Sequence, residues 1–185
     1  MTFIIAFFLM AGQGDSAFYQ AASISEDLSQ LTIVSKSGKF RAPLTEDEQQ
    51  AFEQPRISGS GLTVAWLAAT KNCCTSYPLP TALVIFRKGK VIRRFQEAPP
   101  IWGWSFARGD TAVAYRQSYP HGVSPIFYKL RRISDGKLLA TFTCHPKYNE
   151  ANEAIEGFQA TGTVPTWVKG IANECPAGNV TDQEN

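Results

Sequence analysis

The chain has 185 residues, enough for one domain with a hydrophobic core of its own. Hydrophobic residues make up 44% and charged residues only 18%, which is typical of a well-packed, β-rich protein. The net charge of +2 is too small to indicate binding to nucleic acid or to an anionic membrane surface. Basic residues gather at 87–94 and 129–132, inside strand patterns, where we expect them to form a solvated face.

The N-terminal residues 1–17 resemble a secretory signal, because an apolar run is followed by small residues. The basic start of such a signal is missing, since Lys36 is the first Lys or Arg, and a buried first strand is the alternative. The run is too short to cross a bilayer as a helix. We therefore expect a periplasmic or secreted protein with no membrane span after signal removal. Residues 18–30, small and polar, are expected to form a flexible lead-in.

The first elements after the lead-in are a strand at 31–34 and a short helix. Thr45 and Glu48 have the spacing of a capping box, which predicts a helix over 45–54 that ends before Pro55. β-Branched and aromatic residues between turn signals predict the strands that follow. These lie at 62–67, 82–86, 91–95, 101–106, 111–115, 126–130 and 138–142.

Beyond Cys144 the pattern changes from strand to helical spacing. Ala151, Ala154 and Phe158 recur at helical intervals, which predicts a short helix over 147–158. Residues 31–175 are thus expected to form a single β-repeat domain. The polar residues 176–185 are expected to form a disordered tail.

A repeat runs through the predicted strands. Turns at Gly38, Gly89 and Gly136, each followed by Lys, are 51 (89 − 38) and 47 (136 − 89) residues apart. Val-Ala-Trp at 64–66 and Val-Ala-Tyr at 113–115 are separated by 49 (113 − 64) residues. A nearly constant period of this length is typical of β units that bury their apolar faces against one another.

Two parts of the repeat resemble known proteins. Residues 104–115, with Trp-Ser-Phe, Gly-Asp and Val-Ala-Tyr, and the Ser-Asp-Gly-Lys turn at 134–137 resemble blades of WD40-like and TolB-like β-propellers. The segment Asn-Cys-Cys-Thr-Ser-Tyr-Pro at 72–78 resembles a loop of uncharacterised bacterial exported proteins. The likeness covers about 31–144 and brings no known activity, so it implies no catalytic residues.

The resemblance implies a mainly β fold of antiparallel, blade-like sheets. Closed propellers have four to eight blades, whereas this chain holds two clear units and a partial one. We therefore expect a partial propeller or a face-to-face sandwich, with short helices near 45–54 and 147–158.

The four cysteines are an even number in a chain expected to be exported, which indicates disulfides. Three pairings are possible. We expect Cys73 to pair with Cys74 and Cys144 to pair with Cys175. The second bond would tie the C-terminal segment to the last predicted strand.

No enzyme motif is recognisable in the chain. Nucleophile-elbow, zinc-protease and phosphate-loop patterns are missing from the sequence. Asp110 and Asp135 both fall in turns, where Asp usually binds its own backbone. We therefore expect a non-enzymatic interaction module without a cofactor.

Aromatic residues beside two Pro-containing loops are the candidates for binding. These loops, at 72–80 and 119–125, would lie at one end of the sheets and bind a protein or glycan. Trp66 and Trp104 are expected in the core instead. The candidate binding residues are Tyr77, Trp102, Tyr119 and His121.

The alternative function is metal binding or redox chemistry. Cys73, Cys74 and His121 fall in equivalent loops of the repeat and offer ligands for a soft metal. In an oxidising compartment, disulfides would consume the thiols. His145 is expected to be exposed and incidental.

Overall fold

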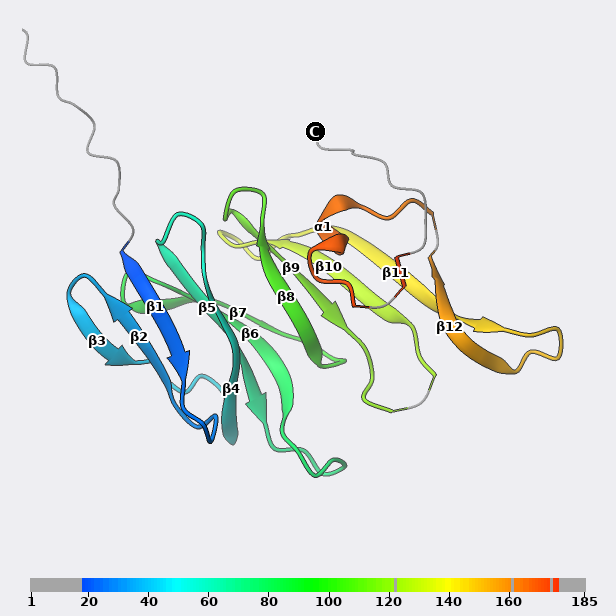
Figure 1. Cartoon of the computed structure of the whole chain (residues 1–185), viewed down its shortest axis with the longest axis horizontal. Helices are drawn as coiled ribbons and strands as arrows, with labels where there is room; N and C mark the ends of the chain where they lie inside the picture. Colours follow the sequence, from blue (N-terminus) through cyan, green and yellow to red (C-terminus); the bar gives the residue numbers. More distant parts are fainter. Residues whose placement is uncertain (1–17, 122, 161, 174, 177–185) are drawn as a thin grey trace, which may run out of the picture.

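A computed structural model describes residues 18–121, 123–160, 162–173 and 175–176. Over these residues it shows a mainly β protein built from three antiparallel sheets, as the sequence predicts (Figure 1). The expected signal segment lies outside the described residues, as does the expected tail from residue 177 on.

The sheets follow one another along the chain, each formed by consecutive strands. The first sheet contains β1 (Tyr19–Ile24), β2 (Leu31–Ser35) and β3 (Gly38–Arg41). The second contains β4 (Gln49–Ile57), β5 (Thr63–Thr70), β6 (Leu79–Arg87) and β7 (Lys90–Gln96). The third contains β8 (Ile101–Ala107), β9 (Ala112–Gln117), β10 (Ile126–Arg132), β11 (Leu138–Tyr148) and β12 (Ala154–Ala160), and the helix α1 (Thr166–Lys169) follows it.

The sequence repeat matches the order of strands in these sheets. The three Gly-Lys turns connect β2 to β3, β6 to β7 and β10 to β11. Gly89 and Gly136 both adopt a φ of 77°, a left-handed conformation that favours glycine. Val64 to Trp66 lies in β5, and Val113 to Tyr115 lies at the same place in β9.

The second sheet is buried on both faces. In β5, Val64 and Trp66 pack toward the first sheet, whereas Ala65 and Leu67 pack toward the third. The strand β6 alternates in the same way, and all four of these β5 side chains are fully buried. A continuous apolar run therefore marks a central strand covered on two sides.

The outer face of the third sheet is covered by the C-terminal segment. Val164, Val168 of α1 and Ile171 pack against Tyr128 and Leu130 of β10. The expected disulfide between Cys144 and Cys175 is present, and it joins β11 to the end of this cover.

The predicted helix over 45–54 is wrong, because this stretch contains most of β4. The Thr45 amide donates to the side-chain Oε1 of Gln49, at 2.9 Å, so the capping-box residues form a turn before a strand. Pro55 is accommodated because it lies where the β4–β5 register shifts, beside Gln54 with a φ of 47°.

The predicted helix over 147–158 is also wrong. Here β11 and β12 form a hairpin whose turn contains Asn149 and Asn152. Asn149 Oδ1 accepts the Glu153 amide at 2.8 Å, and Asn152 has a φ of 60°. Asn favours such turns, and pairing with β11 then determines the structure of a segment with weak helical periodicity.

The lead-in expected to be flexible over 18–30 instead contains β1. Tyr19 is 2% exposed and packs in the core between the first two sheets. The Phe18 and Tyr19 amides both donate to the Gly61 carbonyl, at 3.1 and 2.8 Å. Gln20, Ala21 and Ser23 are exposed on this strand, so its pattern of apolar residues is weak in the sequence.

Candidate functional site

Long loops lie at one end of the sheets and tight hairpin turns lie at the other. The β5–β6 loop, residues 71–78, and the described residues of the β9–β10 loop, 118–121 and 123–125, both extend from the lower edge of the sheets in Figure 1. We call these two loops, together with Trp102, the loop face. It contains all four binding candidates predicted from the sequence.

The β5–β6 loop is held by the side chain of Asn72. Its Oδ1 accepts the amides of Cys74 and Thr75, at 2.8 and 2.9 Å. Its Nδ2 donates to the Tyr77 carbonyl at 3.1 Å. The expected Cys73–Cys74 disulfide is present in the exposed part of this loop. These bonds hold Tyr77 in place with 46% of its surface exposed.

The β9–β10 loop presents Tyr119, 56% exposed, together with the exposed His121. Trp102 is half-buried and contacts the start of this loop. Its Nε1 donates to the Ser118 carbonyl at 2.8 Å. The side chain of Gln54 also donates to the Trp102 carbonyl, at 3.0 Å. Trp102 therefore supports the loop and offers a ligand only part of its ring.

A polar hollow of about 290 Å³ lies at the same end of the second sheet. Glu46 lines it, and its Oε2 binds Nη2 of Arg94 at 2.7 Å while its side chain is only 3% exposed. The other oxygen, Oε1, is buried and has no hydrogen-bond partner among the described residues. We call this the Glu46 hollow, and its remaining lining residues are Thr45, Asp47, Thr70, Thr81 and Gln96.

The unpaired oxygen of Glu46 gives this hollow a chemical preference. A buried acceptor without a donor costs about 1–3 kcal/mol. A hydroxyl or amine of a ligand, or a water molecule, would relieve that cost. Sequence reasoning missed the hollow because its residues come from four separate segments and Glu46 was assigned to a helix. The signal in the sequence that could have indicated this hollow is the pair Thr45 and Glu46 just before the Gln-rich segment 49–54.

A charged cluster lies where the loop between β7 and β8 meets the third sheet. Glu97 binds Lys129, and it binds Nη2 of Arg131 at 2.5 Å. Its Oε1 also accepts a hydrogen bond from the hydroxyl of Tyr115, at 3.0 Å. Burial alone raises the pKa of Glu97, but the bonds to Lys129 and Tyr115 outweigh it, so the pKa lies below its usual value. Burial, and then the charge of Glu97, raises the pKa of Tyr115.

The described residues contain no group of three or more His, Cys, Asp or Glu side chains placed to hold a metal ion. Cys73, Cys74 and His121 are all among the residues described, and Cys73 and Cys74 are bonded to each other. His145 is exposed on β11. Within the same part of the chain, no helix has the length and apolar character that a membrane crossing needs.

Comparison of the sequence with models of known protein families finds no match. Comparison with curated protein sequences finds none either. The geometry of the loop face and of the Glu46 hollow is therefore the basis for a functional proposal.

Proposed function

We propose that this chain is an exported, non-enzymatic β module that binds a glycan or a protein through its loop face. Two observations support export. The sequence begins with a segment that resembles a secretory signal. The cysteines are joined in two disulfides, which persist in oxidising compartments.

Binding through the loop face is supported by two large aromatic side chains on braced loops. Tyr77 is 46% exposed and Tyr119 is 56% exposed, whereas Trp66, Trp104, Tyr115 and Tyr128 are fully buried in the core. Aromatic side chains that are held in place lose little entropy on binding and often dominate binding energies.

The Glu46 hollow favours a glycan among the possible ligands. It gathers three threonines, a carboxylate pair, a guanidinium and an amide within one space. Such groups donate and accept hydrogen bonds with sugar hydroxyls, and Glu46 Oε1 still needs a donor. This unpaired oxygen is the observation on which the preference for a glycan depends.

A glycan array with the full chain tests the proposal. We expect binding that weakens at least about tenfold for Tyr119→Ala and for Glu46→Gln. Tyr148→Ala is the matched control, since Tyr148 is 51% exposed on β11. If no glycan on the array gives a signal that depends on Tyr77, Tyr119 or Glu46, the preference for a glycan is contradicted.

A second candidate function is a redox role for the Cys73–Cys74 pair. Both cysteines are exposed, so a thiol reductant can reach the disulfide. Cys144, in contrast, is fully buried. Titration with dithiothreitol and thiol labelling would support this role if Cys73 and Cys74 are reduced at a potential where Cys144 and Cys175 stay oxidised. Bound copper or zinc in the reduced protein would support the metal-binding alternative.

A further inference from the structure

A second hollow lies at the opposite end of the sheets, among the hairpin turns. It has a volume of about 380 Å³, within the range of small-molecule sites. Three arginines line it: Arg87 at the end of β6, Arg108 in the β8–β9 turn and Arg132 at the end of β10. We call it the arginine hollow, and the rest of its lining is Asp110, Thr111, Ile133, Ser134 and Leu139.

The hollow is built by contacts between the second and third sheets. The Ser60 amide donates to Asp110 Oδ2 at 2.8 Å, which joins two turns from different sheets. Arg93 of β7 donates to the carbonyls of Ile133 and Ser134, at 3.2 and 2.5 Å. These bonds hold the walls together, so the three arginines face a space that is formed before any ligand arrives.

Positive charge is concentrated in this part of the chain. Residues 87–137 contain eleven Lys and Arg but only three Asp and Glu. The cations are Arg87, Lys88, Lys90, Arg93, Arg94, Arg108, Arg116, Lys129, Arg131, Arg132 and Lys137, and the acids are Glu97, Asp110 and Asp135. The total of 18 Lys and Arg against 16 Asp and Glu conceals this separation of charge.

The acids of this region leave the arginines of the hollow largely uncompensated. Glu97 is bound by Lys129 and Arg131, away from the hollow. Asp135 binds Arg132 at 3.1 Å, but both side chains are more than 40% exposed, so solvent screens the pair. Asp110 is the one carboxylate among the residues that line the hollow.

Two of the guanidinium groups have donors to spare. Arg87 uses Nε to donate to Thr63 Oγ1 at 2.8 Å. The guanidinium of Arg108 makes no hydrogen bond or ion pair with the described residues, and its backbone is fixed by a left-handed φ of 50° in the turn. The lining holds three guanidinium groups and one carboxylate, and the balance stays positive when the exposed Asp135 beside Arg132 is counted as well.

We propose that the arginine hollow binds a tetrahedral oxyanion, a phosphate or sulfate group carried by a small molecule or by a lipid headgroup. The planar, forked guanidinium matches two oxygens of such a group at once, and it is charged at any physiological pH. Thr111 and Ser134 place polar side chains in the same space. The site lies at the end of the sheets opposite the loop face, so it stands independently of the proposed binding function.

Titration of the full chain with sodium sulfate and sodium phosphate at constant ionic strength tests the proposal, with sodium chloride as the reference for screening. Binding is followed by NMR shifts of the arginine Nε–H groups and of the Thr111 and Ser134 amides. We expect saturable binding that weakens about tenfold or more in Arg108→Gln, because a charged hydrogen bond is lost. Arg132→Gln should act in the same direction.

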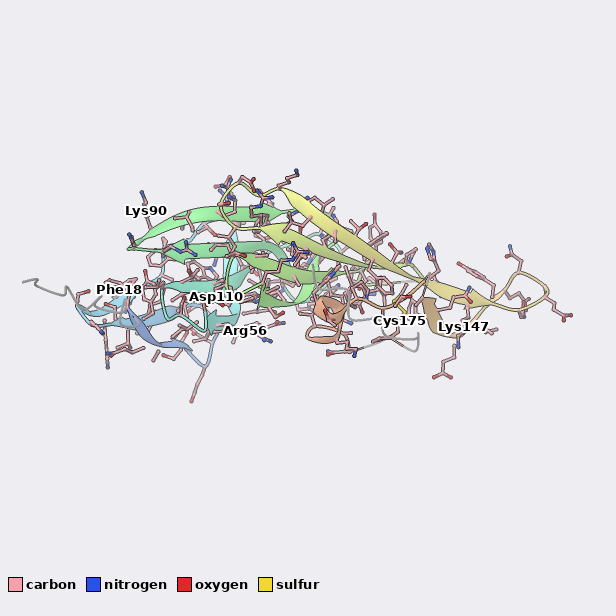
Figure 2. The ribbon with its side chains drawn as sticks, turned by 90° about the horizontal axis from the view of Figure 1, so that it is seen from above. Phe18, Arg56, Lys90, Asp110, Lys147 and Cys175 are labelled. Carbon is pink, nitrogen blue, oxygen red and sulfur yellow. A yellow bond between two sulfur atoms is a disulfide. The ribbon has the colours of Figure 1, made fainter. Side chains whose placement is uncertain are left out.

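Lys147→Gln is the matched control, because it removes one positive charge far from the hollow. Lys147 lies on the β11–β12 hairpin, well away from Asp110 in Figure 2. Equal affinity for chloride and sulfate, or equal weakening in Lys147→Gln and Arg108→Gln, would overturn the proposal. Thermal unfolding of each variant shows whether a loss of binding reflects a loss of folding.

Flotation with vesicles of equal parts phosphatidylcholine and phosphatidylglycerol distinguishes the two sources of the anion. Binding to vesicles that Arg108→Gln abolishes and Lys147→Gln leaves intact would identify a lipid phosphate. Binding of the free anions without binding to vesicles would identify a small soluble phosphate or sulfate. Binding to neither the anions nor the vesicles would overturn the proposal.

Discussion

The second and third sheets share one strand order but differ in the faces that they turn toward the preceding sheet. In the second sheet, Trp66 of β5 pairs with Val84 of β6, and both pack against the first sheet. In the third sheet, Tyr115 of β9 pairs with Lys129 of β10 at the equivalent place. The two sheets therefore share a backbone arrangement, but the side chains that each turns toward the preceding sheet differ in chemistry.

The next pair along the strands shows the same difference. Val64 pairs with Phe86 in the second sheet, and Val113 pairs with Arg131 in the third. The contact between the first and second sheets is apolar, whereas the contact between the second and third adds a charged cluster around Glu97. We expect packing to dominate the stability of the first contact and pH to influence the second.

Trp66→Ala is expected to have the largest effect, because it opens a cavity in the apolar contact. Trp66 is fully buried and packs near Phe52 and Phe86. Loss of such a side chain costs about 3–5 kcal/mol. Urea unfolding followed by circular dichroism measures the change. Tyr119→Ala, at an exposed aromatic residue, should change the free energy of unfolding by less than about 0.5 kcal/mol, and similar losses in both variants would contradict the assigned core.

Removal of the Cys144–Cys175 disulfide is expected to cause the second-largest loss of stability. Among the described residues the third sheet is covered by the C-terminal segment rather than by another sheet, and this bond joins residues 31 positions apart. Cys144→Ser with Cys175→Ser should cost about 2–4 kcal/mol. The matched change, Cys73→Ser with Cys74→Ser, should cost much less, because adjacent residues enclose almost no loop. Thermal unfolding compares the two double variants. A negligible loss for the Cys144 and Cys175 variant would show that the C-terminal cover does not depend on its disulfide, and a larger loss for the Cys73 and Cys74 variant would contradict the expected order.

Glu97→Gln should weaken the charged contact and change its response to pH. Glu97 is 18% exposed and binds three groups of the third sheet, so we expect a loss of about 1–2 kcal/mol at pH 7 after screening by solvent. Because the pKa of Glu97 is lowered by folding, its contribution is present above the usual pKa of Glu and is lost as the pH falls through the lowered value.

The free energy of unfolding of both proteins between pH 7 and pH 3 measures this effect of Glu97. The difference between wild type and Glu97→Gln should shrink toward acidic pH. In addition, Lys129→Met should cost less in the Glu97→Gln background than in wild type, since the pair is already broken. A constant difference across the pH range would show that Glu97 acts through packing alone.

Much of the fold could be predicted because apolar runs and turn residues alternate clearly in the second and third sheets. Two of the missed strands lack this contrast: β1 exposes Gln20, Ala21 and Ser23, and β12 is largely exposed. Both incorrect helices arose from local spacing, where pairing with β5 and β11 determines the structure instead.

The candidate sites were predicted only where they lie within single loops. Tyr77 and Tyr119 were recognisable because prolines and polar residues surround them. The Glu46 hollow and the arginine hollow combine residues from several segments, and no single window of sequence contains them. Basic residues expected to form only a solvated face include Arg87 and Arg132, which line a cavity.

Glu53→Gln is expected to have the smallest effect and the opposite sign. Glu53 of β4 pairs with Leu67, so it faces the contact between the second and third sheets. Burial raises the pKa of Glu53, so the folded state prefers the protonated carboxyl, and the stability that this preference provides is lost as the pH rises through the raised value. At pH 7 the neutral glutamine should therefore stabilise the protein by less than about 1 kcal/mol. Thermal unfolding at pH 7 and pH 4 measures the difference, which should be larger at pH 7. A loss of stability at pH 7 would mean that a partner in the contact holds the Glu53 carboxylate, and that both sheets contribute charges to it.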